Sequence, residues 1–128
     1  MSRNIKIFLA VIILVLIIYP FAKRGYEMHQ YSRAVSQITL SGKDISEVED
    51  GIYEGKYDAV LVKAKVIVHM IDGEIQDIEY EHIHERGARG EQVIENVLEE
   101  QSLQVDTITG ATDSSLVLLK AIDKALFD

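Results

Sequence analysis

The chain has 128 residues, no cysteine, one proline and a formal charge of −8. This length favours a single domain, and the lack of cysteine excludes disulfides, haem attached through C-x-x-C-H and cysteine-ligated iron–sulfur or zinc sites. Four of the 13 basic residues precede residue 25, so the remainder carries nine bases against 21 acids, a balance of −12 that repels phosphate backbones. We therefore expect no nucleic-acid partner.

Residues 1–24 are predicted to form a transmembrane anchor. An uninterrupted apolar run extends from Ile7 to Ala22; as a helix it spans roughly 24 Å, and Lys6 can snorkel to lengthen the span. The alternative is a cleaved signal peptide, which the bulky residues of "YPFA" disfavour because cleavage needs small side chains. Basic residues flank both ends of the run, so the positive-inside rule does not decide the orientation.

Residues 25–47 are predicted to be a linker between the anchor and a domain at residues 48–128. The stretch "KRGYEMHQYSRAVSQITLSGKDISE", which begins at Lys23, is polar with scattered aromatic residues. A spacer is the favoured interpretation. The alternative is that the membrane helix continues to about Ile38.

Three strands are predicted from Asp50 onward. "DGIYEGKY" follows a turn signal, and "AVLVKAKVIVHMI" is dense in β-branched residues. The residues that alternate onto one face of the second segment are Val62, Ala64, Val66 and Val68. Asp72-Gly73 predicts a hairpin turn into "EIQDIEYEHI". An unbroken register would place Asp77 opposite Val68 on the apolar face, so we expect a bulge or a slip.

Two helices are predicted to follow the strands. "GARGEQVIENVLEEQS" carries apolar residues at 93, 94, 97 and 98, a stripe typical of an amphipathic helix. "SSLVLLKAIDKALF" is apolar on most sides and is expected to be buried against the sheet, with Lys120, Asp123 and Lys124 on its solvent edge. The element order predicts an α+β fold: a transmembrane helix, then a small antiparallel sheet packed with two helices.

The segment "VDTITGATDSS", residues 105–115, crowds hydroxyl groups before the last helix. Free N–H groups at a helix start bind anions, and Gly110 and Ala111 leave room for a bulky planar group. The alternative is structural: Thr112, Asp113 or Ser114 caps the helix and Gly110 forms a turn. A threonine hydroxyl without an adjacent base is a poor nucleophile, so a modification of Thr112 would require another enzyme.

The sequence "DTITGAT", Asp106 to Thr112, resembles the D-x-x-[ST]-G-A-[ST] motif of FMN-binding domains. These include the flavoprotein subunits of sodium-translocating NADH:quinone reductases and of Rnf-type complexes. The following "DSS", the upstream "DGIYEGKY", the hairpin and the helix ending in "EEQSLQVD" are similar to the rest of that domain in the same order. The resemblance covers about residues 48 to 127. Within it, this sequence lacks the larger insertions of the respiratory subunits.

The resemblance implies that Thr112 carries FMN through a phosphoester bond, transferred from FAD by a dedicated magnesium-dependent transferase. The cofactor-binding residues that it implies are Thr112, Asp106, Thr109, Gly110 and Ala111. Two serines that follow them, Ser114 and Ser115, are also expected to contact the cofactor. Ser114 and Ser115 fall in the first helical turn, where a capping role is expected.

The predicted function is that of a membrane-anchored electron carrier. It would be an electron-transfer flavoprotein, or a subunit of an oxidoreductase complex, rather than a stand-alone enzyme. Its partners would be redox proteins in the membrane. It would cross the cell membrane once, with its soluble domain outside the cytoplasm. The alternatives are a non-redox membrane-anchored binding or regulatory module and a domain that binds FMN reversibly.

Two other sets of residues could contact a ligand. His82-x-His84, flanked by Glu81 and Glu85, would place two imidazoles on one strand face as metal ligands. A solvated pair is the favoured interpretation, and no metal is expected. Three tyrosines could stack on a flavin ring: Tyr53, Tyr57 and Tyr80. Packing in the core is the commoner role for tyrosines in a sheet.

Overall fold

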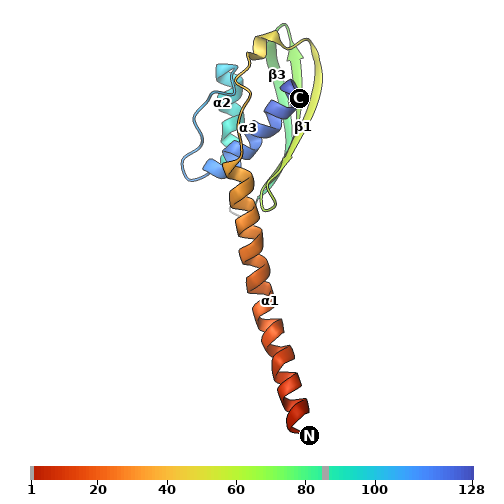
Figure 1. Cartoon of the computed structure of the whole chain (residues 1–128). Coiled ribbons are helices and arrows are strands. Elements are labelled where there is room, and N and C mark those ends of the chain that lie inside the picture. The colour runs from red at the N-terminus through yellow and green to blue at the C-terminus, as the bar shows by residue number, and fades with distance from the viewer. Residues whose placement is uncertain (1, 85–86) are drawn as a thin grey trace.

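The predicted anchor and the first part of the predicted linker form one continuous helix. In the computed structural model, which describes residues 2–84 and 87–128, helix α1 spans Arg3–Ser36 and extends away from the rest of the molecule (Figure 1). The spacer interpretation is therefore wrong for residues 25–36, and the continued helix is correct. The physical reason is that Tyr31, Ala34 and Val35 pack against the core of the domain. This packing stabilises the helical conformation beyond the apolar run.

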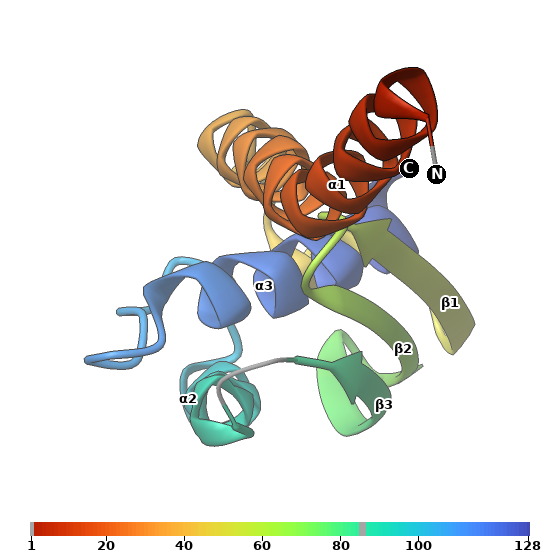
Figure 2. The ribbon, with the colours of Figure 1, turned by 90° about the horizontal axis from the view of Figure 1, so that it is seen from below.

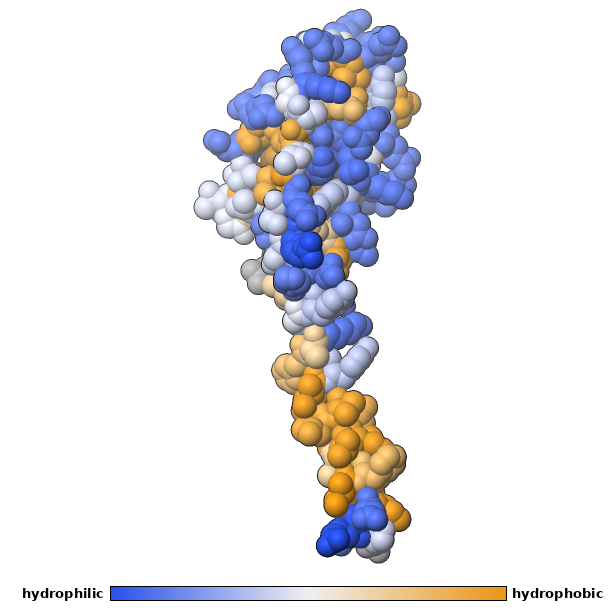
Figure 3. Space-filling model, viewed as in Figure 1, coloured by the Kyte–Doolittle hydropathy of each residue, from blue (hydrophilic) through white to orange (hydrophobic). Residues whose placement is uncertain are grey.

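Helix α1 is long and apolar enough to cross a membrane. Its apolar run forms an orange band with hydrophilic residues on either side of it (Figure 3). No residue of α1 is buried within the structure. The 14 residues from Lys23 to Ser36 extend the helix by roughly 21 Å beyond Ala22.

Three antiparallel strands form a sheet with the order β1-β2-β3. They are β1 (Gly51–Asp58), β2 (Lys63–Ile71) and β3 (Glu74–Ile83). Asp72 and Gly73 both have positive φ, 53° and 75°, which a type I′ turn requires. Met70 pairs with Ile75 but His69 pairs with Asp77, so Gln76 is the extra residue of a β-bulge. The bulge brings Ile78 opposite Val68 and confirms the predicted correction of the register.

The helices cover one face of the sheet and enclose the core. Helix α3 (Thr112–Phe127) lies across β1 and β2, and α2 (Val93–Glu100) lies beside it near β3 (Figure 2). Short 3₁₀ helices, η1 (Ile45–Glu47) and η2 (Arg89–Gln92), precede β1 and α2. The predicted apolar face of β2 is buried, as is most of α3. On the predicted face of α2, residues 93, 94 and 97 are buried and Leu98 is partly buried. The α+β prediction is confirmed.

Asp123 corrects the prediction of a solvent edge on α3, because its side chain is buried. Its Oδ1 accepts hydrogen bonds from the Ser41 N–H, at 3.1 Å, and the Ser41 hydroxyl, at 2.8 Å. The Lys120 ammonium lies 3.5 Å from the same carboxylate and donates to the Thr39 carbonyl at 2.7 Å. These bonds hold the segment after α1 against α3, so a charged residue is buried where it has partners.

A second connection joins α1 to the sheet. The Tyr57 hydroxyl on β1 donates to the Ala34 carbonyl near the end of α1, at 2.7 Å. Tyr57 and Tyr53 are half-buried and pack against the core, whereas Tyr80 is exposed. The anchor helix is therefore fastened to the domain at several points instead of leading to it through an irregular spacer.

Candidate functional site

The motif loop ends in a tight turn that leads directly into α3. The Ala111 N–H donates to the Ile108 carbonyl at 2.9 Å, and Gly110, the third residue of this turn, has a φ of 80°. A type II turn requires positive φ at that position, which favours glycine. The predicted turn at Gly110 is confirmed. Ala111 is the N-cap of α3 and no side chain caps the helix, so the predicted caps at Thr112, Asp113 or Ser114 are wrong.

Ser115 supports the motif loop from inside the domain. Its side chain is buried, accepts a hydrogen bond from the Ile108 N–H at 3.0 Å and donates to the Ala111 carbonyl at 2.7 Å. Ser115 therefore connects both ends of the turn to α3 and does not cap the helix. The capping interpretation missed this role because it depends on the loop folding back over the first helical turn.

A pocket of about 500 Å³ opens beside the motif. Its walls come from four separate parts of the chain: the C-terminal half of α1, the connection between β1 and β2, the residues around η2, and the motif turn with the start of α3. The described residues that line it are Arg24, Met28, Tyr31, Ser32, Leu61, Val62, Gly87, Arg89, Gly110, Ala111, Thr112, Asp113 and Ser114. This volume is within the range of small-molecule and cofactor sites.

The predicted site residues divide into two groups. Gly110, Ala111, Thr112 and Ser114 line the pocket, whereas Asp106, Thr109 and Ser115 do not. Asp106 and Thr109 are exposed on the loop that leads to the turn. Thr112 is exposed as the first residue of α3, and its hydroxyl makes no hydrogen bond to any other residue that the structure describes.

Residues that the sequence analysis did not identify supply the positive charge of the pocket. Arg24, just beyond the apolar run, and Arg89 at the start of η2 both line it. A Cβ added at Gly110 would lie 3.4 Å from Nη1 of Arg89, so the guanidinium lies against the motif turn. Guanidinium groups bind phosphate, and unpaired N–H groups at a helix start favour anions. Residues 25–128 carry a net charge of −12, and against this acidic background the pocket suits an anionic group.

Two contacts hold the walls of the pocket together. The Tyr31 hydroxyl of α1 donates to Oδ2 of Asp113 at 3.1 Å, which connects the anchor to the first turn of α3. Gly90 in η2 is buried, and a Cβ there would lie 2.5 Å from Cβ of Ser114. Only glycine allows η2 to approach the start of α3 this closely, and this approach brings Arg89 to the pocket.

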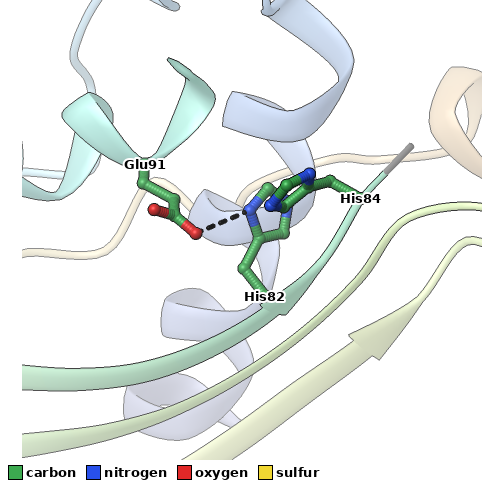
Figure 4. A group of neighbouring side chains, drawn as sticks. All are labelled: His82, His84 and Glu91. Atoms are coloured by element: carbon green, nitrogen blue, oxygen red, sulfur yellow. Dashed lines mark hydrogen bonds and ion pairs between the residues drawn. The ribbon is translucent and has the colours of Figure 1, made fainter. Parts of the chain in front are cut away.

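His82 and His84 form a second polar cluster with Glu91 (Figure 4). The sequence pattern indicated the two histidines but not Glu91. Nδ1 of His82 is 3.2 Å from Oε1 of Glu91, and the two imidazole centroids are 4.9 Å apart. Burial lowers the pKa of His82 more than the neighbouring Glu91 raises it. Glu81 is exposed, and Glu85, the other flanking acid, lies outside the described residues.

The family comparison agrees with the fold and with the position of the motif. A sequence model of the FMN-binding domain matches residues 62–127, which include β2, β3, both C-terminal helices and the whole motif. The matched segment is more than half of the chain. No curated protein and no solved structure matches the chain. The resemblance seen in the sequence is thus confirmed: the chain belongs to the FMN-binding domain family.

Proposed function

We propose that the protein is a membrane-anchored electron carrier that holds FMN covalently on Thr112. The observation that carries the proposal is the position of Thr112, the last residue of the motif. It is the exposed first residue of α3, at the wall of a pocket that two arginines line. The family match supports flavin binding, and the covalent link to Thr112 is our proposal.

The residues of the pocket fit an FMN phosphate. A phosphodiester on Thr112 would carry one negative charge at the positive end of the α3 dipole, with Arg24 and Arg89 on the surrounding walls. Asp113 beside it has the opposite effect, and its carboxylate accepts a hydrogen bond from Tyr31. The bound flavin would supply the electron transfer, and the chain would tether and orient it.

Attachment of the flavin requires a separate enzyme. The Thr112 oxygen would bond to the FMN phosphorus of FAD, the pyrophosphate bond would break, AMP would leave and the hydroxyl proton would pass to the transferase. Among the described residues that line the pocket, the ionisable groups are two arginines, Asp113 and Tyr31, and none is a histidine that could activate the hydroxyl. An FAD-dependent FMN transferase is therefore part of the proposal.

The position of the pocket supports redox partners in the membrane. Arg24 is two residues beyond Ala22, the end of the apolar run, which is a rise of roughly 3 Å along the helix. Arg24, Met28, Tyr31 and Ser32 follow a helical spacing that presents one face of α1 to the pocket. With α1 in a bilayer, the flavin would lie close to the membrane surface and within reach of membrane-bound electron donors and acceptors.

The test of the attachment site is to express the full chain together with a flavin transferase and to measure flavin by intact mass and by fluorescence in a denaturing gel. The wild-type protein should gain the mass of one FMN less one water and give a fluorescent band. Thr112→Val should give neither, and Thr112→Ser should keep some fluorescence. Thr107→Val, at a position that the motif leaves open, is the matched control and should keep the full signal.

The outcomes separate the alternatives. A fluorescent Thr112→Val band would show that the acceptor is wrong. Flavin that co-purifies but leaves on denaturation would indicate a reversible FMN binder. No flavin in the wild-type protein made with the transferase would indicate a binding or regulatory module.

The orientation of the domain is tested separately. We propose that it lies outside the cytoplasm. Protease added to intact cells without an outer barrier should digest residues 25–128. Protection until lysis would place the domain inside.

A further inference from the structure

We infer that His82, His84 and Glu91 form a binding site for a divalent transition-metal ion. The three side chains can each offer one ligand atom, and these atoms lie within 4.8 Å of one another. They come from the end of β3, the residue that follows it and η2, and both imidazoles point toward Glu91 (Figure 4). Imidazole and carboxylate are ligands that zinc and its neighbours accept in proteins.

The orphaned nitrogens of the two histidines carry the inference. Nε2 of His82 and Nδ1 of His84 are buried and have no hydrogen-bond partner among the described residues. The His82 side chain is turned away from the molecular surface. Buried polar atoms normally have partners, and two such atoms in adjacent rings need an explanation. A metal ion would occupy the lone pairs of both.

Glu91 sets the chemistry of His82. Its Oε1 lies 3.2 Å from Nδ1 of His82. A neutral imidazole that donates its Nδ1–H to this carboxylate has its lone pair on Nε2. Carboxylates commonly hold metal-binding imidazoles in this way, which fixes the tautomer and the ring orientation. Glu91 would act either by this contact or by moving onto the ion, and in both cases its removal weakens binding.

The site would stabilise one wall of the flavin pocket. Glu91 is two residues from Arg89, which lines the pocket, and next to Gly90, which packs against Ser114. A metal ion would therefore connect the end of β3 to η2 and limit the movement of Arg89. The metal site is independent of flavin attachment, because none of its three residues lines the pocket.

The test uses the full chain in detergent, made without a flavin transferase and freed of metal with a chelator. Zn²⁺ binding is measured by calorimetry and by metal analysis after gel filtration, and Co²⁺ absorption reports the ligand geometry. We expect one Zn²⁺ per chain and a higher melting temperature when Zn²⁺ is added. The variant His82→Gln with His84→Gln should lose binding. Glu91→Gln, which keeps a hydrogen-bond acceptor, should weaken it by roughly 10- to 100-fold.

The chain supplies a matched control, because it has four histidines. The variant His29→Gln with His69→Gln also removes two of them, including the one near Asp77 and Glu79, and should bind Zn²⁺ as the wild type does. Loss of binding in this control, or wild-type binding by the Glu91→Gln variant, would overturn the assignment. The absence of stoichiometric Zn²⁺ and Co²⁺ binding by the wild-type chain would do the same, and an ordered water would then explain the orphaned nitrogens.

Discussion

Replacement of Ser115 by alanine is expected to loosen the motif loop and destabilise the domain. The change removes two hydrogen bonds, from the Ile108 N–H at 3.0 Å and to the Ala111 carbonyl at 2.7 Å. One intramolecular hydrogen bond contributes about 0.5–1.5 kcal/mol, and a buried donor left unpaired costs about 1–3 kcal/mol. Because Ile108 is only half-buried, water can partly replace the lost acceptor. We therefore expect a loss of about 2 kcal/mol.

The assay is thermal unfolding of the full chain in detergent, followed by circular dichroism. For a domain of this size, a loss of about 2 kcal/mol lowers the melting temperature by roughly 8–16 °C. Flavin attachment at Thr112 should also slow, because the loop that carries the motif is less ordered. The isolated chain without flavin should show the same loss of stability, since the two hydrogen bonds do not involve the cofactor.

Ser114→Ala is the matched control for this prediction. It makes the same chemical change one residue earlier, where the hydroxyl has no hydrogen bond to any residue that the structure describes and Cβ, which packs near Gly90, is retained. The control should change stability by less than about 0.5 kcal/mol. Equal melting temperatures for the two variants would refute the argument that Ser115 holds the turn against α3.

Two further changes test the packing around α3. Gly55→Ala introduces a Cβ that would overlap the backbone of Ala121 and Ala125, so α3 must move away from β1. Urea unfolding should show that the free energy of unfolding falls by about 1–3 kcal/mol or more. Gly25→Ala, where a Cβ enters open space, is the control and should show no loss. Asp123→Ala removes the acceptor of both Ser41 hydrogen bonds, and a loss of about 2 kcal/mol is expected in the same assay. A wild-type midpoint for either variant would contradict the contacts described above.

Several features of this protein follow from local sequence. The length of the apolar run gives a helix that is long and apolar enough to cross a membrane, and the alternation from Val62 to Val68 identifies the buried face of β2. The Asp72-Gly73 pair determines the turn, and the mismatch at Asp77 requires the bulge. The motif is recognisable because its residues are contiguous. Each of these signals depends on neighbours in the chain, so one sequence is enough to detect it.

Other features depend on which surfaces meet when α3 crosses the sheet. Arg24 of α1 and Thr112 of α3 share a pocket although 88 positions separate them, and no local period relates such residues. Asp123 has the spacing of a solvent-facing residue, yet it is buried because the segment after α1 folds over it and supplies partners. Glu91 reaches His82 because Gly90 allows η2 to approach the start of α3. Local preference cannot encode these contacts, since each arises from the steric fit of elements that are distant in sequence.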